Sequence, residues 1–304
     1  MKMSQRTADI IFDTINTIFM IFVAIIMLYP MLNTLAISLN DPTDSLRGNI
    51  FLWPRYFTIE NYVHIFQNDI LLIAFRNSVA RTLIATALGV FICAMAAFVV
   101  SRKDFVLQKP VTIYFLVTMY VSAGLIPTFF LFRDLGLINT FHVYWVPGLF
   151  GAFNVLVIRA FMQGLPESLT EAAEMDGASQ FRVFLQIILP LCKPVLATVG
   201  LWIAVGNWND WFTTFVFITP AHHGTLTVLQ FELYRVLASA MAQMSAQQAG
   251  FAAQAAAGGG GFQQITPVAI RSTITIVATL PILFVYPFLQ KYFVKGVHLG
   301  SVKG

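Results

Sequence analysis

The sequence predicts an all-α polytopic membrane protein with six transmembrane helices, and three observations lead to this class. Hydrophobic residues make up 58% of the 304 residues, and charged residues make up only 11%. The mean hydropathy is +0.75. Soluble domains carry about 25% charged residues, so these values exclude a large soluble protein. Six apolar stretches each have roughly the 20-residue length that a helix needs to cross a bilayer.

The N-terminal stretch is expected to remain in the mature protein as the first span. Asp9, Asp13 and Asn16 interrupt any early apolar core, and no small-residue cleavage site follows Leu28. These features differ from those of a cleaved signal peptide. We expect Pro30 to break this first span near its outer end.

The later spans also contain prolines, which are tolerable because neighbouring helices and waters can satisfy the freed backbone carbonyls. Pro127 lies inside the third span and Pro147 near the start of the fourth. The sixth span contains Pro281 and Pro287. The six predicted spans are residues 14–37, 79–100, 111–132, 141–161, 195–218 and 270–290.

The basic residues predict the orientation of these spans. Cytoplasmic loops carry an excess of lysine and arginine. With six spans, all seven lysines and four arginines fall on the side of the N-terminus, against seven arginines outside or at the outer rim. We therefore expect both termini to be cytoplasmic, including the tail of residues 291–304.

Two long loops are predicted on the outer side, residues 38–78 and 219–269. The first contains FLWPRYF, whose aromatic residues favour the membrane–water boundary. The second is rich in Ala, Gln and Gly and uncharged over residues 238–264. Because Ala and Gln favour helices, we expect a short helix near residues 226–249, followed by a flexible joint at the four glycines 258–261. This segment is either a tolerated low-complexity insertion or a surface for an external partner.

The sequence carries no motif for catalysis or for binding a metal or a cofactor. It contains no GxxxxGK[ST] phosphate-binding loop, no HExxH, no GxSxG and no Cys/His cluster. Cys93 and Cys192 lack metal-ligand spacing and are expected to be buried thiols. The chain is therefore not expected to be an enzyme. If its work requires ATP, a separate chain must hydrolyse the nucleotide.

An acidic segment, residues 166–193, interrupts the apolar pattern between the fourth and fifth spans. Ser168 and Glu171 have the spacing of a capping box that starts a helix. Gly177 can adopt the left-handed conformation that ends it. A second helix is expected from about residue 179 to 189, closed by Pro190. The segment therefore reads as a hairpin of two short helices.

The charges of this hairpin indicate what kind of partner it could bind. A helix with Glu171, Glu174 and Asp176 should not lie on the anionic cytoplasmic leaflet, which attracts basic segments. Ala172 and Ala173 would give it a slim face that a deep cleft could admit. The hairpin is either a docking element for a protein partner or a solvated loop helix without one.

The hairpin resembles the EAA motif of ABC importer permeases at every spacing. The matching residues are Glu171, Ala172, Ala173, Gly177, Ile187, Leu189 and Pro190. More of the chain resembles the carbohydrate branch of that family, which contains the maltose permeases, and most closely its permeases for complex or acidic oligosaccharides such as alginate or pectin fragments. The stretches that carry this resemblance are ENYVHIF at 60–66, SAGLIPTFFLFRDLGLINT at 122–140, WNDWF at 208–212, LPILFVYPFLQKYFVKG at 280–296 and GSVKG at 300–304.

This resemblance implies a bacterial inner-membrane importer that contains several other proteins. The hairpin would dock in a cytoplasmic ATPase dimer that binds ATP and Mg, a second permease subunit would complete the pore, and an external solute-binding protein would deliver an oligosaccharide. The coupling residues would be Glu171, Ala172, Ala173, Glu174, Asp176, Gly177, Ile187, Leu189 and Pro190. The tail residues Gly300, Ser301, Val302, Lys303 and Gly304 would reach the ATPase dimer interface.

The substrate pathway is expected near the outer part of the fifth span. Asp210 is the only carboxylate within the six predicted spans, and polar groups inside spans usually face the bundle interior. Aromatic faces, amides and carboxylates suit sugar rings and hydroxyls. Alternatively, Asn209 and Asp210 bond the backbone of a neighbouring span. The candidate pathway residues are Tyr120, Asn154, Trp202, Trp208, Asn209 and Asp210.

Three alternatives stay open at this point. An ATP-coupled permease for peptides or amino acids would share the hairpin. An ion-driven secondary transporter would need no docking helix and would show more ion ligands in the membrane. An intramembrane enzyme would need a catalytic pair. Arginines at the outer rim, Arg81 among them, would favour an anionic sugar, but similar numbers of external acids oppose them.

Overall fold

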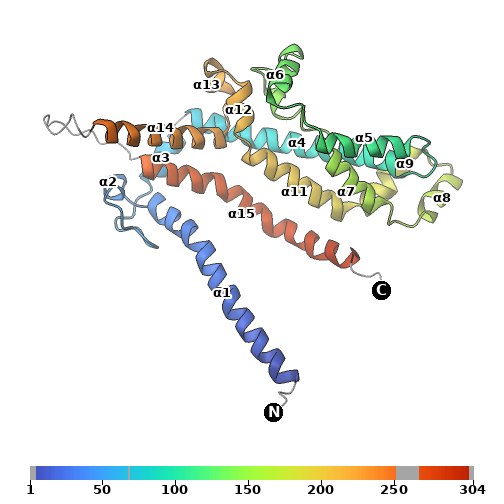
Figure 1. Cartoon of the computed structure of the whole chain (residues 1–304), viewed down its shortest axis with the longest axis horizontal. Helices are drawn as coiled ribbons and strands as arrows, with labels where there is room; N and C mark the ends of the chain where they lie inside the picture. Colours follow the sequence, from blue (N-terminus) through green and yellow to red (C-terminus); the bar gives the residue numbers. More distant parts are fainter. Residues whose placement is uncertain (1–4, 68, 251–266, 301–304) are drawn as a thin grey trace. The chain divides into compact units, whose positions relative to one another are not determined.

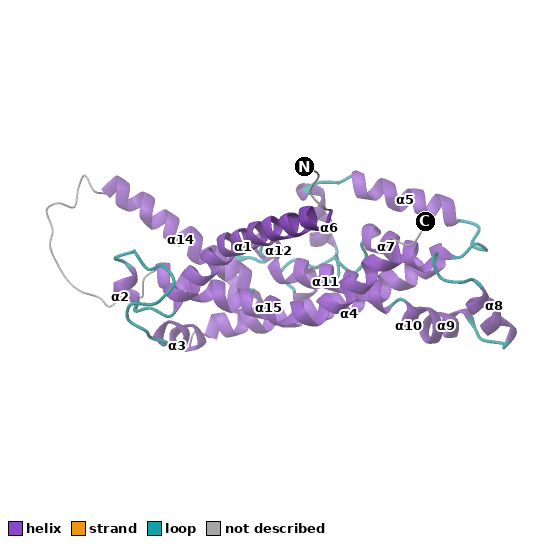
Figure 2. Ribbon diagram, turned by 90° about the horizontal axis from the view of Figure 1, so that it is seen from below, coloured by secondary structure: helices purple, strands orange, loops and turns teal. Residues whose placement is uncertain are grey.

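The computed structural model describes residues 5–67, 69–250 and 267–300, and these residues are almost entirely helical (Figure 1 and Figure 2). Within them, strand-like pairing is limited to an isolated bridge between Asn40 and Phe57. The all-α prediction is confirmed for this part of the chain. Two compact units are present, Met1–Asn68 with Leu233–Thr279, and Asp69–Glu232 with Leu280–Gly304.

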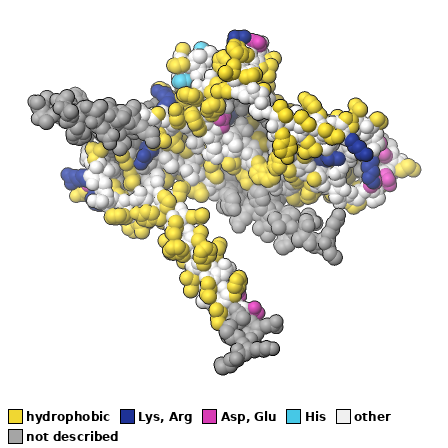
Figure 3. Space-filling view, viewed as in Figure 1, with side chains coloured by type: hydrophobic (Ala, Val, Ile, Leu, Met, Phe, Trp, Pro, Cys, Tyr) yellow, Lys and Arg dark blue, Asp and Glu magenta, His cyan; other side chains and the backbone are white. Residues whose placement is uncertain are grey.

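The first unit begins with one long apolar helix, α1 (Gln5–Ser38). Its stretch Asp9–Ser38 is long and apolar enough to cross a membrane, and hydrophobic side chains make up much of its visible surface (Figure 3). The predicted break at Pro30 is wrong, since α1 runs through this residue. In an apolar surrounding, a continuous helix that loses one backbone hydrogen bond at proline costs less free energy than a broken helix, which leaves several backbone groups without partners.

The segment after α1 folds back on the helix end through buried polar contacts. It contains α2 (Pro42–Ser45) and leads to α3 (Glu60–Gln67). The Asn61 amide donates to the carbonyls of Ser38 and Asn40, each at 2.9 Å. Much of the predicted outer loop 38–78 is therefore helical.

Two further helices carry the Ala/Gln/Gly segment and the C-terminal region. The helix expected near residues 226–249 is confirmed as α14 (Leu229–Gly250). The predicted glycine joint, residues 258–261, lies outside the described residues. The final helix, α15 (Pro267–Gly300), continues through both prolines of the predicted sixth span. The predicted tail is therefore helical as far as Gly300.

The second unit is organised around α4 (Asp69–Ser101), which packs along α11 (Lys193–Asn209) and α7 (Ala152–Met162) (Figure 1). Small residues allow close approach, since a Cβ at Gly200 would lie 3.4 Å from Val90 Cγ2. α4 begins ten residues before the predicted start at 79, because the apolar run ILLIAF extends the helix toward the N-terminus.

The predicted third span is not one straight helix. It consists of α5 (Gln108–Tyr120) and α6 (Leu125–Asp134), bent by 115°. The break depends on Gly124, whose φ of +82° suits glycine. Pro127 lies in the first turn of α6, a position that tolerates proline, and not within a continuous span.

The predicted fourth and fifth spans are also shorter or broken. Over the fourth, a 3₁₀ turn η1 (Phe141–Tyr144) precedes the 11-residue α7. Over the fifth, α11 ends at Asn209, Asp210 has an extended backbone, and α12 (Phe212–Phe217) follows. The short elements η3 (Pro220–His222) and α13 (His223–Leu226) lead to α14.

The described residues contain two helices that could each cross a membrane, Asp9–Ser38 and Asp69–Ser101. Two bent pairs, α5 with α6 and Gln180–Leu191 with α11, raise the total to four if each pair is one span. The number of six spans and their orientation stay predictions.

Candidate coupling site

The acidic segment folds as the predicted pair of short helices joined at a glycine. The first helix, α8, is Ser168–Met175. Gly177 has a φ of +78° and ends it as predicted. The amide of Ala178 donates to the carbonyl of Ala173 at 3.0 Å, as in a Schellman motif. The capping-box prediction is wrong, because Glu167 occupies the N-cap position and makes no side-chain capping bond.

The second half of the hairpin is a continuous helical stretch with a widened turn. It comprises α9 (Gln180–Val183), the π-helical turn η2 (Phe184–Ile188) and α10 (Leu189–Leu191). Pro190 was expected to close this helix, but the helix includes it. The π turn relieves the usual i−4 pairing near the proline. The chain bends by 82° between α10 and α11 instead.

The two alanines of α8 differ in burial, so they do not form the single slim face expected from the sequence. Ala173 is 9% exposed and belongs to the apolar core around Phe98 and Phe184. Ala172 is exposed, and Met175 is 88% exposed. The outer face of α8 therefore presents Ala172 and Met175, while Ala173 anchors the helix to its own unit.

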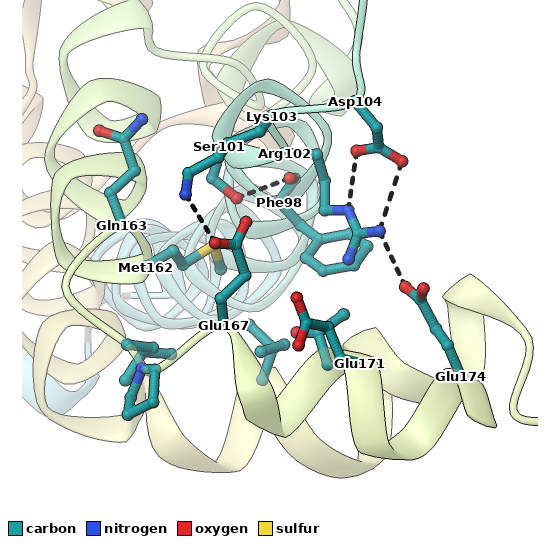
Figure 4. A pocket seen from close by; sticks show the side chains of 14 residues that line it. Phe98, Ser101, Arg102, Lys103, Asp104, Met162, Gln163, Glu167, Glu171 and Glu174 are labelled. Carbon is teal, nitrogen blue, oxygen red and sulfur yellow. Dashed lines mark hydrogen bonds and ion pairs between the residues drawn. The ribbon is translucent and has the colours of Figure 1, made fainter. Parts of the chain in front are cut away.

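Three acidic residues follow one face of α8 and its N-cap, at positions i, i+4 and i+7. Figure 4 shows Glu167, Glu171 and Glu174 pointing toward the residues that follow α4. Lys103 Nζ lies 2.6 Å from Glu167 Oε2, and Arg102 Nη2 lies 2.8 Å from Glu174 Oε1. These basic and acidic side chains gather at the end of the unit that carries α8 (Figure 3). We call Glu167, Glu171 and Glu174 the acidic stripe, and Arg102 and Lys103 its basic pair.

The electrostatics of this set follow from the contacts. Hydrogen bonds from Gln180 and Arg102 hold the pKa of Glu174 below its ordinary value. The hydrogen bond to Glu167 raises the pKa of Lys103. Hydrogen bonds to Asp104 and then Glu174 raise the pKa of Arg102 despite its partial burial. Each of these shifts favours the charged form of Glu174, Lys103 or Arg102.

A pocket of about 570 Å³ separates α8 from the end of α4. Its floor is apolar and includes Phe98, Met162 and Ile188, while the acidic stripe and its basic pair form its walls (Figure 4). Glu171 lies between the two ion pairs. Arg102 and Lys103 were not among the predicted site residues. Two signals in the sequence point to them: the i, i+4, i+7 spacing of the three glutamates, and the predicted position of both segments on the same side of the membrane.

The candidate pathway residues fall into two groups. Trp208, Asn209 and Asp210 lie together at the break between α11 and α12. Asn209 Oδ1 accepts from Gln230 Nε2 at 3.3 Å, and Trp208 is 6% exposed. Of the others, Trp202 packs on Phe153 of α7, with ring centroids 5.6 Å apart. Asn154 follows Phe153 on α7, while Tyr120 ends α5 and is 86% exposed.

Asp210 is engaged by a fully buried arginine that the sequence argument had placed at the outer rim. Arg81 of α4 has 0% exposure, and its Nη1 lies 3.5 Å from Asp210 Oδ2. Its Nη2 donates to the Asp210 carbonyl, and its guanidinium lies 5.2 Å from the Tyr144 ring centroid. Asp210 Oδ1 also accepts from the Thr213 amide at 3.1 Å. Asp210 therefore bonds the backbone of its own next helix and an arginine side chain of α4.

Two polar residues of α4 that lie close to Arg81 in the sequence form hydrogen bonds with the irregular backbone that follows α12. The Asn77 amide donates to the carbonyls of Thr225 and Thr227, each at 2.9 Å. Ser78 Oγ accepts from the Leu229 amide at 2.9 Å. Non-helical backbone at membrane depth needs partners of this kind. Side chains of α4 thus supply hydrogen-bond partners for the non-helical backbone groups that follow α11.

Comparison with known proteins places the chain among transport components. Residues 89–299 match the family described as "Binding-protein-dependent transport system inner membrane component". The polygalacturonan/rhamnogalacturonan transport system permease protein YtcP of Bacillus subtilis (strain 168) is 32% identical, over 97% of this chain and 99% of the relative. The arabinooligosaccharides transport system permease protein AraQ of Halalkalibacterium halodurans is 26% identical, over 99% of this chain and all of the relative.

A solved structure shares the fold. A chain from the crystal structure of a bacterial ABC transporter "involved in the import of the acidic polysaccharide alginate" matches with a TM-score of 0.79. It is 23% identical, and the match covers 96% of this chain and 99% of that chain.

Proposed function

Because the chain belongs to the family of binding-protein-dependent transport system inner membrane components, we propose that it forms half of the translocation pathway of an ATP-driven importer. A second permease subunit forms the other half, and an external solute-binding protein delivers the substrate. ATP and Mg are bound by a cytoplasmic ATPase dimer. The family match over residues 89–299, which spans the whole acidic hairpin, is the observation that carries this proposal.

The proposed coupling element is α8 with the turn that follows it. The exposed side of α8 presents Ala172 and Met175. The small side chain of Ala172 allows close approach to a partner, and the flexible apolar side chain of Met175 can fill an irregular gap in a cleft. Glu171 is exposed and takes part in neither of the two ion pairs, so we assign it as the carboxylate of the stripe that pairs with a basic residue of the ATPase. The tail residues 301–304, proposed to reach the ATPase dimer interface, lie outside the described residues.

The proposed substrate is an oligosaccharide, with an acidic one favoured. Relatives are named for polygalacturonan and arabinooligosaccharides, and the structural relative for alginate. The charge at the helix break is compatible with this, because Arg81 neutralises Asp210 at 3.5 Å. A pathway beside this pair would not present an uncompensated carboxylate to an anionic sugar.

Co-purification with the ATPase tests the coupling element. Glu171→Lys and Gly177→Asp should each abolish association with the ATPase while the chain remains in the membrane. Lys109→Gln, a charge change outside the hairpin, is the matched control and should associate normally. Normal association and transport in both hairpin variants would refute the assignment of α8.

Uptake competition tests the substrate class. Oligogalacturonate should compete with the transported sugar in the reconstituted importer, and a neutral arabino-oligosaccharide of equal length should compete less. Stronger competition by the neutral sugar would overturn the acidic assignment while leaving the importer assignment intact.

A further inference from the structure

The link between α8 and the rest of its unit depends strongly on side chains. The backbone of α8 packs mainly on the neighbouring α9, and Thr170 and Ala173 are its buried residues. Toward α4, the structure shows the two ion pairs across the pocket (Figure 4). A movement of α8 would therefore reach α4 partly through these pairs.

Of the two pairs, the one made by Arg102 is better placed to transmit a movement. Lys103 and Glu167 are 79% and 54% exposed, and such exposed pairs contribute little. Arg102 is only 22% exposed and contacts two carboxylates, Asp104 at 3.1 Å and Glu174 at 2.8 Å. Glu174 is further held by the Gln180 amide at 2.8 Å. Arg102 thus joins the end of α4 to both helices of the hairpin.

We propose that Arg102 is a positioning residue that transmits displacement of α8 to α4 through its hydrogen bond to Glu174. This inference rests on the proposed docking of α8 to an ATPase. It assigns to Glu174 an internal role, whereas the docking proposal leaves Glu171 for the partner.

Because α4 is continuous, a displacement at Arg102 is transmitted along the whole helix. α4 runs without a break from Asp69 to Ser101, directly before Arg102. The same helix packs closely on α11, with Gly89 facing Ile203, and it carries Arg81 at the break after α11. A displacement at the Arg102 end is therefore carried along a stiff helix to the polar contacts of the proposed pathway.

The experiment uses the complete importer in proteoliposomes, with three readouts measured on each variant: ATPase association, ATP hydrolysis and substrate uptake. Arg102→Gln should keep association, keep hydrolysis within about twofold, and reduce uptake roughly tenfold, as expected for loss of a partly buried, charge-assisted hydrogen bond. Glu174→Gln should reduce uptake by a similar factor. Asp104→Asn is the matched control. It removes the carboxylate that contacts Arg102 outside α8, so uptake should stay near the wild-type rate.

A charge swap separates positioning from folding. Arg102→Glu with Glu174→Arg, made in an Asp104→Asn background to remove repulsion, should restore at least half of the uptake. Wild-type uptake in Arg102→Gln, or no recovery in the swap, would overturn the inference. A parallel loss of hydrolysis and uptake would also overturn it, because Arg102 would then support folding or docking. If the wild-type chain itself does not associate with an ATPase, the proposed function fails first.

Discussion

Replacing Asp210 with asparagine isolates the charge of the buried Arg81–Asp210 pair. The asparagine oxygen can still accept from the Thr213 amide, and the backbone carbonyl at 210 still accepts from Arg81. The main change is therefore that the Arg81 guanidinium, with 0% exposure, loses its counter-charge. We expect Asp210→Asn to destabilise the fold.

The size of the effect follows from distance and burial. At 3.5 Å, two unit charges attract by about 5 kcal/mol at an effective dielectric constant of about 20. Removing one partner of a buried pair costs roughly 3–5 kcal/mol. Because Asp210 is 33% exposed and partly screened, we expect about 2–3 kcal/mol. Arg81→Met should cost less, since the carboxylate left behind can hydrate.

Unfolding of the purified chain by SDS in mixed micelles measures these differences. The double variant Arg81→Met with Asp210→Asn should be more stable than Asp210→Asn alone, because no buried charge remains unpaired. An unchanged stability of Asp210→Asn would refute the reasoning. So would a double variant whose loss equals the sum of the two single losses.

Three further changes test other parts of the fold. Gly200→Leu should destabilise by about 1–3 kcal/mol through overpacking against Val90, whereas Gly206→Leu, where an added Cβ meets nothing within 4 Å, should change the unfolding free energy far less. Gly177→Ala should cost about 1–2 kcal/mol at its φ of +78° and speed amide hydrogen exchange in α8; unchanged exchange would contradict the role of this turn. Because the folded pKa of Glu174 is lowered from 4.5, its tie to Arg102 is fully present above that value and is lost as the pH falls through the folded pKa. The protection factors of the α8 amides, which correct for the intrinsic slowing of exchange at low pH, should therefore fall on acidification, and should fall less in Glu174→Gln.

The sequence predicted those elements whose signals are local. The turn at Gly177 needed only a residue that tolerates a positive φ, and the helix α14 needed only good helix formers. The apolar length of α1 was equally visible. Pro30 was misjudged because proline lowers local propensity, while the requirement to keep backbone bonds in an apolar medium favours the continuous helix.

The helix breaks were missed because hydropathy does not change across them. Gly124 and Asp210 each lie within a long stretch that is apolar on average, so the mean hydropathy of a window does not mark the break. The pairing of Arg81 with Asp210 joins residues 129 positions apart, and nothing in one sequence aligns them. The inward turn of Ala173 likewise depends on tertiary packing around Phe184.

The central claim is that the outer face of α8 contacts an ATPase subunit, and site-directed cross-linking tests it most directly. The native thiols Cys93 and Cys192 are buried, so a thiol-reactive cross-linker should act at an introduced cysteine. Met175→Cys, on an 88% exposed position, should cross-link to a protein that carries a GxxxxGK[ST] motif. Ala173→Cys, on the buried face, should not. Absence of that product from Met175→Cys in an importer that transports its substrate would contradict the account.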